Sequence, residues 1–127
     1  MIFRMLNAVM AALFALSVAV QYNDPDPLRW MAIYGAACAI SIVSAVRGVA
    51  PFATSMAVAI VALVWSVFWM VTSKPTLSVF THMFDAWEMK STPIEEAREA
   101  CGLLIVAVWM AINVLRAWVS AGRAALG

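Results

Sequence analysis

The sequence has little charge, one histidine, two cysteines, and only five residues each of glycine and proline. Charged residues make up 12% of the 127 positions, whereas about a quarter is usual in soluble domains, and 65% of the positions are hydrophobic. This balance excludes a disordered chain and an ordinary soluble enzyme. The net charge of +1 excludes nucleic acid as a partner through bulk electrostatic attraction. A membrane protein remains, and its length predicts a single domain over residues 1–127.

Recognisable catalytic and metal-binding motifs are also missing. A single histidine argues against a dedicated zinc or copper site. Cys38 and Cys101 lie in apolar stretches without metal-ligand spacing, and we interpret them as small buried residues. The sequence contains no HExxH, GxSxG or P-loop motif. It therefore predicts no particular reaction, and whether the protein is an enzyme stays open.

Long apolar runs are what the sequence has in abundance. The four runs cover about residues 5–21, 28–46, 52–71 and 97–119. A bilayer core about 30 Å thick is crossed by roughly 20 helical residues, and hydrocarbon forces the backbone to pair its own hydrogen bonds. The predicted fold class is therefore an all-α membrane protein with four transmembrane helices in a lipid bilayer. The first run also resembles a secretory signal, but it is as apolar as the others, and we expect it to be retained.

Turn chemistry separates the runs. Gln21–Pro27 reads QYNDPDP, which cannot continue a helix, and Asp26 with the proline after it predicts an N-cap and a first helical position. Gly48, with a proline three residues later, indicates a tight turn between the second and third spans. Thr92–Glu95 has the form of a capping box at the start of the fourth span.

The only long connection lies between the third and fourth spans. Its apolar residues at i, i+3, i+4 and i+7 are Phe80, Met83, Phe84 and Trp87. This spacing is typical of one helix face, and it predicts a short amphipathic helix at the membrane interface over about residues 76–90. The alternative is an apolar loop packed across the helix ends.

The charges sort by side of the membrane. With four spans, all seven carboxylates fall on one face: Asp24, Asp26, Asp85, Glu88, Glu95, Glu96 and Glu99. The opposite face carries Arg4, Arg47, Arg116 and Arg123. Lysine and arginine number four on each face, but Arg29 and Arg98 sit in helix starts beside carboxylates, so Arg4 weighs more. We expect an integral protein of a bacterial inner membrane with both termini in the cytoplasm and the acidic face outside.

The acidic face is the candidate functional site. Its candidate binding side chains for a cation or polar headgroup are Gln21, Asn23, Asp24, Asp26, Glu95, Glu96 and Glu99. An oxygen-rich set suits a hard cation such as calcium, which takes six to eight oxygens, although no EF-hand spacing is present. The alternative is that the acids at the helix starts only cap the helices and stabilise their dipoles, by about 0.3–1 kcal/mol each.

Two further pairs of residues bear on this site. Glu95 and Glu99 share a helix face, where like charges repel, so a proton, a bound cation, Arg29 or Arg98 should neutralise them. We expect the two arginines to balance the charge of the carboxylates. His82 and Asp85, at i and i+3, are weaker metal candidates, because a lone histidine is more typical of an interfacial polar residue.

Two segments of the chain, QYNDPDPLRWMAIYG and PIEEAREACGLL, resemble the transmembrane protein 220 family of small four-span membrane proteins. The resemblance covers most of the chain. Position by position, its motifs correspond to Gln21, Asn23, Asp24, Pro25, Asp26, Pro27, Glu95, Glu96, Arg98 and Glu99. The resemblance implies the four-span fold and a site on the acidic face, and it implies no reaction.

Three functions therefore compete. The first is a site on the acidic face that binds a cation or a polar headgroup. The second is a non-catalytic accessory subunit, with other membrane subunits as partners. The third is a lipid-modifying membrane enzyme in which paired carboxylates act as acid and base. A transporter is disfavoured, because no charged residue in the middle of a span defines a pathway.

Overall fold

The computed structural model describes residues 1–24, 26–82 and 92–126, and every regular element in these ranges is a helix. In chain order they are α1 (Ile2–Val20), the 3-10 turn η1 (Gln21–Asn23), α2 (Pro27–Arg47), α3 (Phe52–Ser73), α4 (Leu77–His82) and α5 (Thr92–Ala125). Within these ranges, α1, α2, α3 and the Ile94–Ala125 part of α5 are long and apolar enough to cross a membrane. The predicted fold class, four transmembrane helices with a short helix between the third and fourth, is confirmed.

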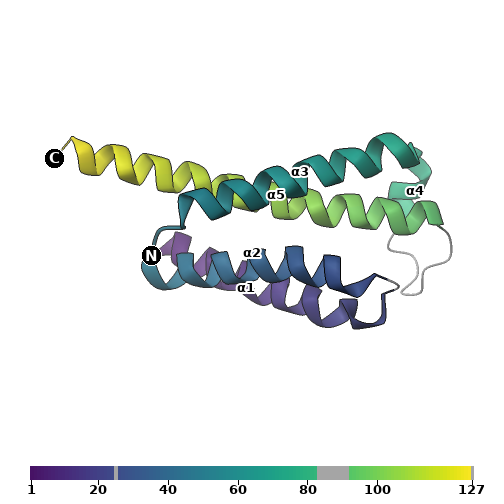
Figure 1. The fold of residues 1–127 in the computed structure, drawn as a ribbon, viewed down its shortest axis with the longest axis horizontal. Coiled ribbons are helices and arrows are strands. Elements are labelled where there is room, and N and C mark those ends of the chain that lie inside the picture. Colours follow the sequence, from purple (N-terminus) through teal and green to yellow (C-terminus); the bar gives the residue numbers. More distant parts are fainter. Residues whose placement is uncertain (25, 83–91, 127) are drawn as a thin grey trace.

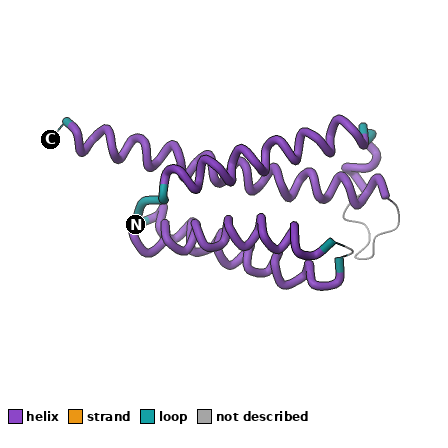
Figure 2. The backbone as a smooth tube through the Cα atoms, in the orientation of Figure 1, coloured by secondary structure: helices purple, strands orange, loops and turns teal. Residues whose placement is uncertain are grey.

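The four long helices form two antiparallel pairs, α1 with α2 and α3 with α5 (Figures 1 and 2). Backbones lie close within each pair and farther apart between the two pairs. Trp30 of α2 stacks on Trp65 of α3 with ring centroids 4.7 Å apart, and Phe3 of α1 stacks on Trp109 of α5 at 6.4 Å. Aromatic rings therefore bridge a gap that small residues could not fill.

Small and apolar residues explain the packing within and between the pairs. Ala62 and Ala100 are buried on the facing sides of α3 and α5, where a small side chain allows close helix approach. Leu103, Val106 and Met110 of α5 have no exposed surface and form the centre of the core. Most exposed side chains along the helices are apolar, as a surface in contact with lipid requires.

The turns follow the sequence pattern closely. Asp26 occupies the N-cap position of α2 and Pro27 its first turn, as predicted, but the Asp26 side chain makes no capping hydrogen bond. Gly48 ends α2 with φ of 82°, a left-handed conformation that glycine adopts without a steric penalty, and its N–H donates to the Ser44 carbonyl at 2.8 Å. The predicted tight turn between the second and third spans is confirmed. Lys74 closes α3 in the same left-handed region, with φ of 42°.

The two ends of the bundle differ in charge. The basic end, where α1 begins and α2 ends, carries Arg4, whose guanidinium donates to the carbonyls of Ala45 and Val46 at 2.7 Å each. A cation at this position satisfies the last carbonyls of α2 and complements its helix dipole. At the same end α5 continues past the other helices, and residues 118–126 are exposed (Figure 1). The acidic end, where α1 ends and α5 begins, carries the candidate site.

Only part of the long connection between α3 and α5 is described. Helix α4 covers Leu77–His82 of the segment expected at about residues 76–90. Met83, Phe84, Asp85, Trp87 and Glu88 lie outside the described residues. The predicted capping box also stays a prediction, because the side chain of Thr92 is not among those described.

Candidate cation site at the acidic end

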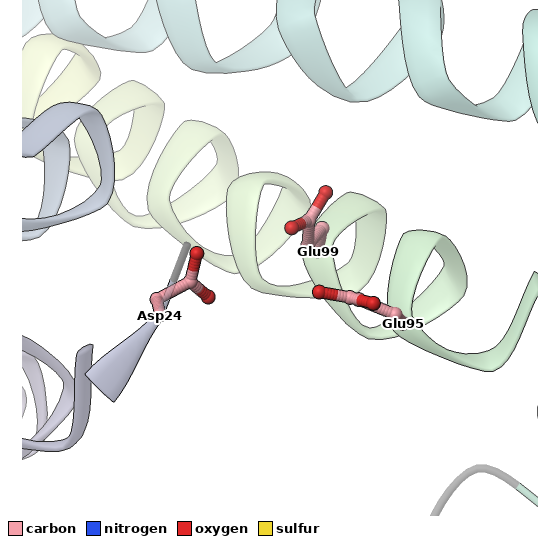
Figure 3. A group of neighbouring side chains, drawn as sticks. All are labelled: Asp24, Glu95 and Glu99. Carbon is pink, nitrogen blue, oxygen red and sulfur yellow. The ribbon is translucent and has the colours of Figure 1, made fainter. Parts of the chain in front are cut away.

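Three carboxylates meet at the acidic end of the bundle. Asp24 follows η1, whereas Glu95 and Glu99 lie in the first turns of α5, so the cluster joins segments about 70 residues apart. One carboxylate oxygen from each residue lies within 4.8 Å of the other two, and all three residues are half-buried (Figure 3). We call these three residues the acidic cluster.

The turn after α1 holds Asp24 in place. The chain leaves α1 through one 3-10 turn, and the Asp24 N–H donates to the Gln21 carbonyl at 3.1 Å. The backbone at Asp24 is then extended, and its Oδ1 accepts the N–H of Asp26 at 3.1 Å. Such aspartate turns are stable because the side chain replaces a backbone acceptor. The QYNDPDP segment thus presents one carboxylate toward α5.

The start of α5 is positioned from two sides. Ser66 of α3 donates to the Ala100 carbonyl at 2.8 Å, which ties α5 to α3 at the residue after Glu99. On the other side, Tyr34 of α2 packs directly over Gly102, where a β-carbon would collide with the tyrosine hydroxyl. Glycine at this position therefore lets α2 approach α5 one turn inward from the cluster.

Neither Ser66, Tyr34 nor Gly102 was predicted from the sequence as part of the site. The only signal was a glycine inside the apolar fourth run, which is typical of close helix packing but does not name the opposing residue. Tyr34 and Ser66 lie inside apolar runs as well, and the contacts that make them relevant come from helices distant in the sequence.

Asp26 and Arg29 form a separate ion pair beside the cluster. Arg29 Nη2 lies 2.8 Å from Asp26 Oδ2, and the two side chains are 46% and 61% exposed. The Arg29 guanidinium also lies over the rings of Trp30 and Trp65, at 5.7 and 5.9 Å from their centroids. Asp26 is consequently engaged away from the acidic cluster.

The structure thus brings only some of the predicted residues together. The sequence predicted Arg29 or Arg98 as the partner of Glu95 or Glu99. Among the described residues, the ion pair of Arg29 is with Asp26, and for Arg98 the prediction stands. Charge balance by these arginines also stays a prediction.

The remaining candidate residues lie outside the acidic cluster or outside the described part of the chain. Gln21 and Glu96 are half-buried, and His82 is exposed at the end of α4. Neither Glu96 nor His82 belongs to the acidic cluster. The side chain of Asn23 and all of Asp85 lie outside the described part of the chain.

The spacing of the cluster limits which cation it could hold. Two oxygens bound to one calcium ion at 2.3–2.6 Å lie at most about 5 Å apart, whereas magnesium at about 2.1 Å allows only about 4.2 Å. The three oxygens of the cluster lie within 4.8 Å of one another, an upper limit that falls inside the range for two oxygens bound to one calcium ion. Without a neutralising partner, each pair of carboxylates at this distance repels by roughly 1–3 kcal/mol, depending on the local dielectric.

Comparison with known proteins identifies the family of the chain. The family model described as "Transmembrane family 220, helix" matches residues 13–115, a stretch that contains all three residues of the acidic cluster. The chain belongs to Transmembrane family 220. The resemblance seen in the sequence is thereby confirmed, and this family member is a small integral membrane protein with four apolar helices. No solved structure matches the chain.

Proposed function

We propose that this member of Transmembrane family 220 binds a cation at the acidic cluster, with calcium as the preferred ion. The observation that carries the proposal is the approach of Asp24, Glu95 and Glu99 to within 4.8 Å from two distant segments. Like charges this close destabilise an apo protein, so a bound divalent cation gains from all three at once.

The position of the cluster points to a polar lipid headgroup as a further ligand of the same ion. Glu95 and Glu99 lie at the start of the membrane-spanning part of α5, where lipid phosphates are found. Three carboxylates supply only part of the six to eight oxygens that calcium takes. Phosphate oxygens can complete the coordination, which would make the site a calcium-dependent headgroup site.

We also propose that the acidic end faces away from the cytoplasm of a bacterial cell, with both termini inside. Arg4, Arg47, Arg116 and Arg123 lie at or beyond the basic end, as the positive-inside rule favours for the cytoplasmic side. Reporter fusions at the termini and single cysteines near residue 26 should report opposite compartments. Labelling of both positions from the same side would overturn this orientation.

Calcium binding is tested on the full chain in lipid nanodiscs. We expect calcium chloride to raise the melting temperature and magnesium to raise it less at equal ionic strength. A dissociation constant on the order of 10⁻⁴ to 10⁻³ M is typical of extracellular calcium modules. Equal responses to calcium, magnesium and choline salts would contradict a calcium site.

A matched pair of variants makes the test specific. Glu99→Gln removes one carboxylate of the cluster and should abolish the calcium-dependent shift. Glu96→Gln makes the same charge change on the same helix outside the cluster, and it should retain the shift. Repeating both in phospholipid nanodiscs and in a maltoside detergent, which carries no phosphate, separates the bare ion from the headgroup. A calcium shift that needs phospholipid supports a headgroup ligand, and an equal shift in both media supports binding of the ion alone.

A second candidate function is that of an accessory subunit, and one observation favours it. Helix α5 continues beyond the bundle at the basic end (Figure 1). Leu115 near this end is 59% exposed, and Trp118, in the exposed stretch 118–126, is 67% exposed. Large exposed side chains on a projecting helix can bind another membrane subunit. Cross-linking through Trp118→Cys in native membranes should then capture a heterologous protein. Migration as a monomer or homodimer after gentle solubilisation would count against this function.

A further inference from the structure

A second group of polar side chains lies inside the bundle toward the basic end. Five polar residues there have no exposed surface: Asn7, Ser41, Ser44, Ser55 and Asn113. They come from all four membrane-spanning helices. We call them the polar layer. None carries a charge, and the acidic cluster lies at the opposite end of the same helices.

Contacts between helices show that the residues of the polar layer lie at one level of the bundle. Arg4 binds the carbonyls of Ala45 and Val46, and Cys38 donates to the Ala11 carbonyl, so Asn7 on α1 lies opposite residues 42–43 of α2. Trp109 Nε1 donates to Ser41 Oγ at 3.2 Å, which sets α5 beside α2. Asn113 lies one turn beyond Trp109 and therefore beside the last turns of α2.

Both asparagines use their amide nitrogens and leave their amide oxygens unpaired. Asn7 Nδ2 donates to the Phe3 carbonyl at 3.1 Å, and Asn113 Nδ2 donates to the Trp109 carbonyl at 3.0 Å. A carbonyl only accepts, so these contacts decide which atom of each amide is nitrogen. The two Oδ1 atoms are fully buried and have no hydrogen-bond partner among the described residues.

The serines of the layer do not supply the missing donors. Ser44 donates its hydroxyl to the Ile40 carbonyl at 2.8 Å, and Ser55 donates to the Pro51 carbonyl at 2.7 Å. Ser41 Oγ accepts from Trp109, and its hydroxyl makes no hydrogen bond to either asparagine oxygen. Two buried acceptors on two different helices therefore call for a small donor that the described part of the chain does not provide.

We propose that the polar layer binds internal water, whose O–H groups donate to the amide oxygens of Asn7 and Asn113. Water is small, neutral and offers two donors, and buried waters typically make about three hydrogen bonds to groups of this kind. A bare monovalent cation fits less well, because the layer contains no carboxylate to offset the desolvation of a charge. Water would then join the helix pairs at this level, in addition to the hydrogen bond from Trp109 to Ser41.

The test is nuclear magnetic resonance on the full chain, labelled with nitrogen-15 at asparagine only, in nanodiscs. The sequence holds three asparagines, so three side-chain amide signals are expected. Asn7→Gln and Asn113→Gln keep the amide and assign these signals by removing one each. We expect dipolar water cross-peaks at both Asn7 and Asn113, separated from exchange peaks by their sign in a rotating-frame experiment.

Two controls make the outcome decisive. In Ser41→Ala both cross-peaks should remain. A cross-peak that reached the asparagine only by relay through the Ser41 hydroxyl would disappear in this variant. Replacing sodium and potassium by N-methylglucamine should leave the amide shifts unchanged. Absence of a dipolar cross-peak at either asparagine overturns the proposal, and so does a shift that depends on the monovalent cation. Neither readout depends on calcium binding at the acidic cluster.

Discussion

The acidic end and the polar layer both gather polar side chains from several helices, but they differ in charge and burial. The acidic cluster holds three half-buried carboxylates whose oxygens face one another. The polar layer holds only amides and hydroxyls, all without exposed surface. Ions and water reach a half-buried site at a helix end easily, so carboxylates can be kept there, whereas a fully buried charge carries a large desolvation penalty. Burial thus decides which kind of polar site is possible.

The largest expected effect concerns the packing that supports the acidic cluster. Gly102→Val should lower the free energy of unfolding by about 1–3 kcal/mol, because the new side chain collides with Tyr34 and overpacks the contact between α2 and α5. Unfolding in mixed micelles with increasing dodecyl sulfate measures the change.

Gly35→Ala is the control for this variant. Gly35 follows Tyr34 in α2, and a β-carbon there meets nothing within 4 Å. Alanine should be neutral or stabilise the helix by up to about 1 kcal/mol. Equal losses in both variants would show that the packing around Tyr34 has no special role at the acidic end.

The second prediction probes the repulsion within the cluster. In the presence of a chelator, Glu99→Gln should raise the free energy of unfolding by about 1 kcal/mol, because it removes one charge from three facing carboxylates. Glu96→Gln should raise it less. The same micelle unfolding assay, run with and without calcium, measures both. A loss of stability in Glu99→Gln without calcium would mean that the cluster is already neutralised by the protein.

The third prediction concerns the basic end, where a charged side chain binds backbone carbonyls rather than other charged side chains. Arg4→Gln should destabilise the protein by about 1 kcal/mol, because the last carbonyls of α2 lose two hydrogen bonds from a cation. Arg123→Gln, in the exposed continuation of α5, removes the same charge and should have little effect. Thermal unfolding of both variants in one nanodisc preparation gives the comparison, and equal effects would argue for a bulk charge effect.

The smallest effect is expected for Asp26, which belongs to the same acidic segment but not to the cluster. Its ion pair with Arg29 is largely exposed, so Asp26→Asn should change stability by less than about 0.5 kcal/mol. Calcium affinity should also stay within about twofold of the original chain, because a charge outside the cluster acts only through screened solvent. Isothermal titration in nanodiscs checks this, and a loss of binding would extend the site to Asp26.

Much of the fold followed from the sequence, because each span and turn depends on local chemistry. Four apolar runs, the proline after Asp26 and the glycine at position 48 predicted helices and turns that the structure contains. The partners of side chains were harder to predict. The sequence suggested that Asp26 belonged to the binding set, yet an i, i+3 ion pair with Arg29 engages it, and that choice depends on how α2 leaves the turn.

The sequence alone determined that this protein lies in a membrane and has four spans, and it predicted that the carboxylates gather at one end, because hydropathy and charge are properties of each segment separately. Only the tertiary structure decided that Asp24, Glu95 and Glu99 meet while Asp26 does not, and that Asn7 and Asn113 share a buried level. Those outcomes depend on the rotation and register of helices distant in the chain. Packing of whole faces sets these quantities, and no local pattern encodes them.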